Sequence, residues 1–132
     1  MGTIASNNID LMRKLIEILS KTSHRYIISK GHLHNEYELS DNMYGEKYLP
    51  QTQILPFVDL VITHGGNNTV CETFYFGKSM IVLPVFLYQF DNAQRIHELG
   101  FGVRLDAHEF TENELLSSVE KLLNDSNLKL KL

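Results

Sequence analysis

Short apolar runs recur along the chain and are separated by segments with helical periodicity. The runs fall at residues 25–29, 59–63, 80–83 and 102–105, and most of their positions are aliphatic or β-branched. They lack the strict alternation of apolar and polar residues that marks a sheet with one wet face. The pattern therefore predicts four strands of a parallel sheet that is covered on both faces.

The segments between these runs carry apolar residues three and four positions apart, which is the spacing of one helical face. The sequence predicts a short helical turn and four helices, at residues 52–57, 7–22, 68–76, 91–99 and 111–123.

Three positions mark the expected helix ends. Gly77 and Gly100 follow the helices at 68–76 and 91–99, where a glycine can adopt the left-handed backbone of a helix C-cap. Thr111 with Glu114 three residues later predicts a capping box at the start of the last helix.

Strands and helices alternate, so the predicted fold class is α/β, a Rossmann-like doubly wound parallel sheet with helices on both faces. We expect a single domain over residues 1–124 and a loose tail over residues 125–132, where leucine and lysine alternate. Residues 30–47 are polar and are expected to form a loop.

The stretch DLVITHGGNNTVCE, residues 59–72, combines a strand, a glycine turn and a helix start. Free backbone N–H groups and the positive end of the helix dipole make such a turn an anion site. His64, Asn68 and Thr69 add polar side chains there, and Gly66 lets the backbone approach a ligand closely. Glu72 lies about one helical turn beyond Asn68 and could accept hydrogen bonds from hydroxyl groups. The chemistry predicts a phosphate site with a sugar-hydroxyl acceptor beside it.

Composition narrows the choice of partner. The net charge of the 132 residues is −4, with acidic and basic residues mixed along the chain, which argues against nucleic acid as the main partner.

The only cysteine, Cys71, excludes an intramolecular disulfide and is interpreted as a core residue. No apolar run is long enough for a membrane span, and we expect a cytoplasmic location. His32 and His34 have no third ligand nearby, so no metal site is predicted.

The runs YLPQTQIL, DLVITHGGNNTVCETFYFGKSMIVLP and QFDNAQRIHELGFGVRL resemble the donor-binding half of UDP-dependent glycosyltransferases of the GT-B fold, the UDP-glucosyl and UDP-glucuronosyl transferases. The resemblance extends from Gly2 to about Leu123. Relative to this family, the chain is truncated at both ends.

The resemblance implies a role for each matching position. Tyr48 falls where the family has an aromatic platform for uracil, and Gln51 falls where the family contacts the uracil edge. Glu72 matches the carboxylate that binds both ribose hydroxyls, and Gln89 matches the glutamine that binds the transferred sugar. The positions that match diphosphate contacts are Thr3, His64, Gly66, Asn68 and Thr69.

The resemblance also implies what this chain lacks. Tyr88 replaces the aspartate that precedes Gln89 in the family, and a phenol is a bulkier and weaker acceptor for sugar hydroxyls than a carboxylate. The acceptor-binding half, which holds the general base, would have to be supplied in cis or by a partner chain. The expected ligand is UDP or a UDP-sugar as donor substrate, with no cofactor. Alternatives that stay open are a non-catalytic UDP-binding or interaction protein, the donor subunit of a split transferase, and a homo-oligomer.

Overall fold

The structure is a computed structural model and describes residues 9–29, 38–46, 48–63, 67–84, 87–100, 102–107 and 109–124. The chain divides into two compact units, Met1–Pro50 and Gln51–Leu132.

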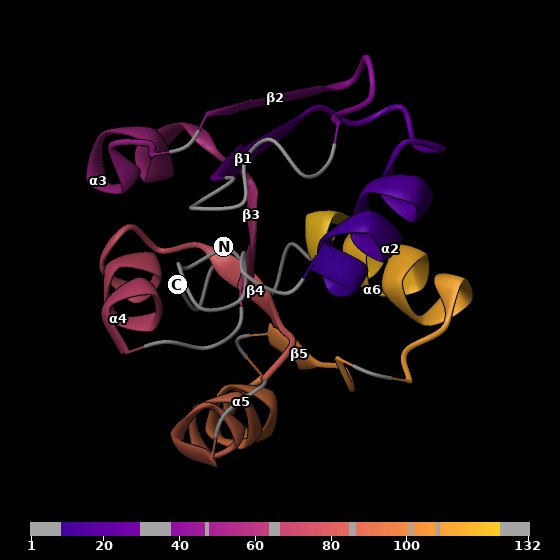
Figure 1. The fold of residues 1–132 in the computed structure, drawn as a ribbon. Coiled ribbons are helices and arrows are strands. Elements are labelled where there is room, and N and C mark those ends of the chain that lie inside the picture. Colours follow the sequence, from indigo (N-terminus) through magenta and orange to yellow (C-terminus); the bar gives the residue numbers. More distant parts are fainter. Residues whose placement is uncertain are drawn as a thin grey trace. The chain divides into compact units, whose positions relative to one another are not determined.

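The first unit contains one described helix and a two-stranded parallel sheet (Figure 1). These elements are α2 (Ile9–Leu19), β1 (Tyr26–Ser29) and β2 (Met43–Glu46). The two strands pair from Tyr26 opposite Met43 to Ser29 opposite Glu46. One face of α2 is buried, as its apolar spacing predicts, and comprises Leu11, Met12, Leu15, Ile16, Ile18 and Leu19.

Strand β2 lies inside the segment that was predicted to be a loop, so the prediction for residues 30–47 is wrong at residues 43–46. The strand has only four residues, and Gly45 and Glu46 break its apolar pattern. The residue that precedes β2, Asn42, is held in place by its side-chain amide, which donates to the carbonyl oxygens of Leu19 at 3.1 Å and His24 at 3.0 Å. These contacts depend on tertiary structure, which local sequence pattern does not encode.

The second unit is built on a three-stranded parallel sheet in the order β3-β4-β5. Its elements are α3 (Gln51–Ile54), the 3-10 helix η2 (Leu55–Phe57), β3 (Leu60–Thr63), α4 (Asn67–Tyr75), β4 (Ser79–Val82), α5 (Leu87–Leu99), β5 (Gly102–Arg104) and α6 (Glu112–Asn124). In this unit α4 and α5 lie on one face of the sheet and α6 lies on the other (Figure 1).

Strand β4 is the centre of this sheet, and all four of its residues are buried. Met80 and Val82 pack against Val70 of α4 and Ala93 and Ile96 of α5. On α6, the buried residues are Leu115, Ser118, Val119 and Leu122. Burial on both faces explains why the strand residues form a continuous apolar run.

The predicted fold class is confirmed, because parallel strands alternate with helices that cover both faces of the second sheet. The four predicted strands differ from the observed ones by at most one residue at either end. Two helices differ more: α2 ends at Leu19 rather than at residue 22, and α5 begins at Leu87 rather than at residue 91. The boundary between residues 1–124 and the tail stays a prediction, since residues 125–132 lie outside the described residues.

The predicted helix ends are confirmed. Thr111 Oγ1 accepts from the Glu114 N–H and Glu114 Oε1 accepts from the Thr111 N–H, both at 3.1 Å. Gly77 and Gly100 have φ values of 67° and 77°, so both occupy the left-handed region.

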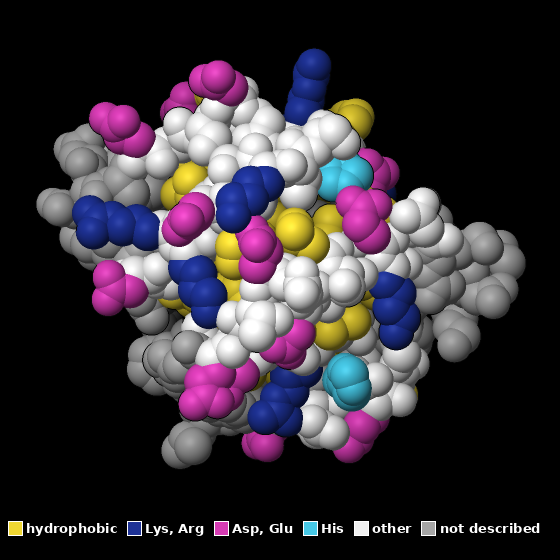
Figure 2. Space-filling view, turned by 90° about the vertical axis from the view of Figure 1, so that its right-hand side faces the viewer, with side chains coloured by type: hydrophobic (Ala, Val, Ile, Leu, Met, Phe, Trp, Pro, Cys, Tyr) yellow, Lys and Arg dark blue, Asp and Glu magenta, His cyan; other side chains and the backbone are white. Residues whose placement is uncertain are grey.

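Charged side chains of both signs are interspersed on the face of the described residues that Figure 2 shows. This mixed arrangement differs from the basic face that a nucleic-acid backbone requires.

Candidate functional site

The candidate site begins where β3 ends. Residues 64–66 separate Thr63, the last residue of β3, from Asn67, the first residue of α4. The first turn of α4 therefore lies at the carboxyl edge of the parallel sheet, where ligands of such sheets bind. The first turn of α4 carries no acidic residue, so no carboxylate within that turn competes with an anionic ligand for its N–H groups.

Gln51, Thr69 and Glu72 come together at this helix. The Gln51 side-chain amide, at the start of α3, donates to Glu72 Oε2 at 2.5 Å and reaches Thr69 Oγ1 at 3.4 Å. The three side chains form one polar group from two helices that are about twenty residues apart in sequence. Sequence reasoning had assigned these residues to three separate parts of a nucleotide, so it missed their contact.

Thr69 is held by the packing of α4. Its side chain is only 8% exposed, and its carbonyl oxygen accepts from the Thr73 hydroxyl at 2.6 Å. Thr73 is completely buried. Thr69 therefore has a fixed position beneath the site, whereas its neighbour Asn68 is exposed at the surface of the same turn.

Cys71 is exposed, so the interpretation of this residue as part of the core is wrong. The buried face of α4 passes through Val70 and Thr73, and Cys71 falls on the opposite side together with Asn68. The helix is short and has mixed polarity, so its sequence alone did not separate the two faces.

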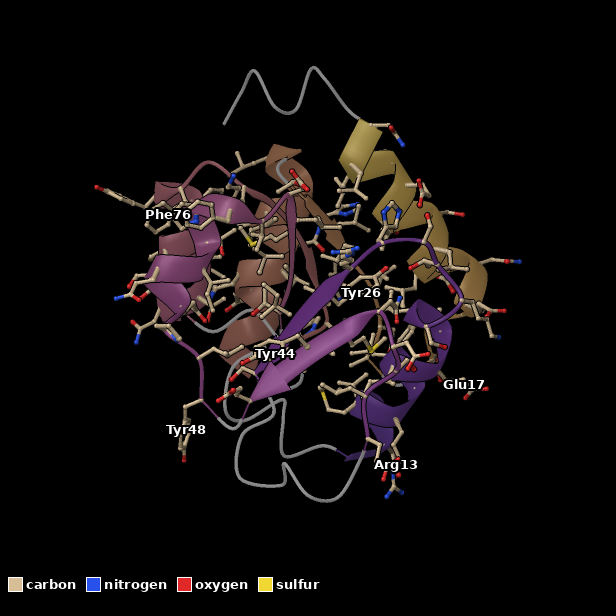
Figure 3. The ribbon with its side chains drawn as sticks, turned by 90° about the horizontal axis from the view of Figure 1, so that it is seen from above. Arg13, Glu17, Tyr26, Tyr44, Tyr48 and Phe76 are labelled. Atoms are coloured by element: carbon tan, nitrogen blue, oxygen red, sulfur yellow. The ribbon has the colours of Figure 1, made fainter. Side chains whose placement is uncertain are left out.

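The remaining predicted site residues are not tested by the structure. Thr3, His64 and Gly66 lie outside the described residues. Gln89 is part of α5, but its side chain is not described. Tyr48 belongs to the first unit; the residue is 60% exposed, and its side chain projects away from the ribbon (Figure 3). Their roles at the nucleotide stay predictions.

Two negative observations apply to the described residues alone. Within them, no group of three or more histidine, cysteine, aspartate or glutamate side chains is arranged to bind a metal ion. None of the described helices combines the length and the apolar character of a membrane span.

Sequence comparison places residues 1–131 in the family described as "UDP-glucoronosyl and UDP-glucosyl transferase". The chain is 29% identical over 128 residues to the uncharacterized UDP-glucosyltransferase YojK of Bacillus subtilis, which covers 95% of this chain and 32% of that protein. It is 38% identical over 93 residues to UDP-glucuronosyltransferase 1A6 of Oryctolagus cuniculus, which covers 69% of this chain and 18% of that protein.

Solved structures support the same fold. The glycotransferase of kitacinnamycin superposes with a TM-score of 0.91 at 24% identity, covering 99% of this chain and 35% of that one. Spinosyn rhamnosyltransferase SpnG, complexed with thymidine diphosphate, superposes with a TM-score of 0.84 at 23% identity, covering 98% and 37%. The chain thus spans about a third or less of these proteins. Because the family match extends over nearly the whole chain, the protein belongs to the UDP-glucuronosyl and UDP-glucosyl transferase family.

Proposed function

We propose that this chain is the donor-nucleotide-binding half of a glycosyltransferase and that its ligand is UDP or a UDP-sugar. The observation that carries the proposal is the convergence of Gln51, Thr69 and Glu72 at the first turns of α4. This turn offers N–H donors to a diphosphate, and Glu72 offers a carboxylate to a diol, at the sheet edge where nucleotides bind in such folds.

The nucleoside is assigned to three residues. Glu72 accepts hydrogen bonds from the two ribose hydroxyls, since an ionised carboxylate has acceptor positions for both. Tyr48 supplies an aromatic face on which uracil stacks. The contact of Gln51 with Glu72 supports a position beside the ribose rather than at the uracil edge, because its amide hydrogens are already directed toward α4.

The diphosphate and the sugar are assigned mainly through the family resemblance. His64, Gly66 and Asn68 contact the diphosphate at the turn before α4 and at its first residues, and Thr3 contacts it from the N-terminal segment. The leaving diphosphate is stabilised by these donors and by the helix dipole, with no metal ion required. Gln89 binds the transferred hexosyl group.

Glycosyl transfer requires an acceptor-binding half in addition to a donor-binding half. The acceptor, which we propose to be a small lipophilic molecule with a hydroxyl group, binds to a second half supplied in cis or by a partner chain. That half provides the general base that deprotonates the acceptor hydroxyl. The 132 residues alone are expected to bind the donor without transferring the sugar.

Titration of the chain with UDP, followed by calorimetry and by backbone amide chemical shifts, tests the proposal. We expect saturable binding with shift changes at residues 67–72, and a loss of about tenfold or more in affinity for Glu72→Gln, because hydrogen bonds to charged groups contribute about 1.5–3 kcal/mol. Gln53→Met, at an exposed position of α3, is the matched control and should bind like the wild type. Absence of binding at millimolar UDP would refute the proposed function.

A further inference from the structure

The Gln51 amide has only one possible orientation in its contact with Glu72. A carboxylate accepts hydrogen bonds and cannot donate them at neutral pH, so the atom that faces Glu72 Oε2 must be the amide nitrogen. The same nitrogen carries a second hydrogen, and the neighbouring acceptor is Thr69 Oγ1 at 3.4 Å. One amide group therefore donates to both residues.

This arrangement sets the direction of the Thr69 hydroxyl. A hydroxyl that accepts a hydrogen bond keeps its own hydrogen to donate elsewhere. Because Thr69 is only 8% exposed, few water molecules compete for that hydroxyl. Thr69 is thereby prepared as a donor, which is the polarity that a phosphate oxygen needs.

The same arrangement sets the plane of the Glu72 carboxylate. The Gln51 amide donates a hydrogen bond to Oε2 of this carboxylate. A carboxylate that is fixed through one oxygen presents the other, Oε1, in a defined direction. Glu72 is half-buried, so its carboxylate is only partly hydrated.

We infer that Gln51 is a positioning residue of the nucleotide site: it orients Thr69 as a donor and Glu72 as an acceptor before the ligand arrives. This inference rests on the proposed function. It differs from the role that the resemblance implies for Gln51, which is contact with the uracil edge. It also predicts that Gln51 affects ligand affinity only through Thr69 and Glu72.

The ligand-free protein provides the first test, through the side-chain amide signals of Gln51 in ¹H–¹⁵N spectra. We expect two well-separated proton signals, one moved downfield by the carboxylate. Glu72→Met should move one signal and Thr69→Val the other, while the signals of Gln53 stay unchanged. Two averaged signals at random-coil positions in the wild type would overturn the inference without any ligand.

Affinity for ligands with and without a base provides the second test. UDP and ribose 5-phosphate are titrated into the wild type, Gln51→Met and the control Gln53→Met. The positioning role predicts that Gln51→Met weakens both ligands by a similar factor of about ten. Contact with the uracil edge predicts instead that only UDP is weakened, and that result would overturn the inference while leaving the proposed function intact.

A mutant cycle that combines Gln51→Met with substitutions of both partners completes the design. If Gln51 acts through its two partners, Gln51→Met should have little further effect on UDP affinity in a protein that already carries Thr69→Val and Glu72→Met. Additive losses would contradict the positioning role. Failure of the wild type to bind UDP would refute the proposed function and, with it, the ligand-directed role of Gln51. If the wild type binds UDP but the losses of affinity are additive, only the role of Gln51 is refuted.

Discussion

Replacing Gly102 with alanine tests how closely β5 is held against β4. Gly102 is the first residue of β5 and pairs with Met80 of the central strand. A Cβ atom at Gly102 would lie 2.2 Å from the backbone oxygen of Met80 and 2.9 Å from Cγ2 of Ile96. The Ile96 methyl can give way by rotation, but the oxygen belongs to the backbone of a completely buried residue. The alanine variant can therefore fold only if β5 moves away from β4.

The cost of that movement follows from two contributions. Overpacking in a closely packed interior costs about 1–3 kcal/mol. Each ladder hydrogen bond that is weakened between β4 and β5 adds about 1 kcal/mol. We expect Gly102→Ala to lower the free energy of unfolding by about 3 kcal/mol, which corresponds to a fall in Tm of about 10 °C for a domain of this size.

Urea unfolding followed by far-UV circular dichroism measures this change. Gly77→Ala is the matched comparison, because Gly77 has φ 67° at the end of α4 and its substitution costs about 1–2 kcal/mol from backbone strain alone. Gly102→Ala should be the more destabilising of the two. A loss below about 0.5 kcal/mol, with unchanged hydrogen exchange at Val103 and Leu105, would refute the close approach of the two strands.

Three further predictions concern the side-chain contacts of Thr111, Asn42 and Tyr44. Thr111→Ala removes the acceptor for the Glu114 N–H and should cost about 1 kcal/mol in urea unfolding, while Thr111→Ser should stay close to the wild type. Asn42→Ala leaves three carbonyl oxygens without their shared amide donor and should cost about 2 kcal/mol, and Asn42→Asp should cost more because a carboxylate cannot donate. The hydrogen bond to Glu46 and the negative charge of that carboxylate raise the pKa of Tyr44, so its hydrogen bond is fully present below the ordinary tyrosine pKa of 10.0 and is lost as pH rises through the raised value. Tyrosine ring ¹³C shifts measured against pH should show Tyr44 titrating later than in the Glu46→Gln variant, and identical midpoints would contradict the contact.

The sequence predicted those parts of the fold that burial alone determines. Strands β3 and β4 are continuous apolar runs because residues on both of their faces are at least partly buried. Strand β2 could not be predicted in the same way, since Gly45 interrupts it and Glu46 is exposed. Its place beside β1 depends on a parallel pairing and on the contacts of Asn42, which join residues about twenty positions apart.

The candidate site, like the fold, could be predicted from the sequence only in part. The helix start after β3 follows from local pattern, and the resemblance implies roles for individual positions around it. Neither source predicts that Gln51 and Glu72 touch, because their separation of 21 residues corresponds to no helical or strand period. Asn68 and Thr69 are adjacent and chemically alike in sequence, yet one is exposed and the other is almost buried. Only the packing of α4 separates their roles.

The two ends of α4 allow binding and stability to be distinguished by experiment. At its C-terminal end, the Lys78 N–H bonds to the Thr73 carbonyl and the Gly77 N–H bonds to the Phe74 carbonyl, a Schellman arrangement that uses none of the side chains of Gln51, Thr69 and Glu72. Gly77→Ala should therefore lower the free energy of unfolding and leave UDP affinity unchanged at temperatures where the variant is folded. Gln51→Met should leave the free energy of unfolding close to the wild-type value and lower the affinity for UDP. The substitution removes two N–H donors from the site, while the methionine side chain keeps the length of glutamine. If both variants lose stability and affinity in proportion, the loss of binding reflects unfolding of α4, and the ordered arrangement of Gln51, Thr69 and Glu72 has no separate role in recognition.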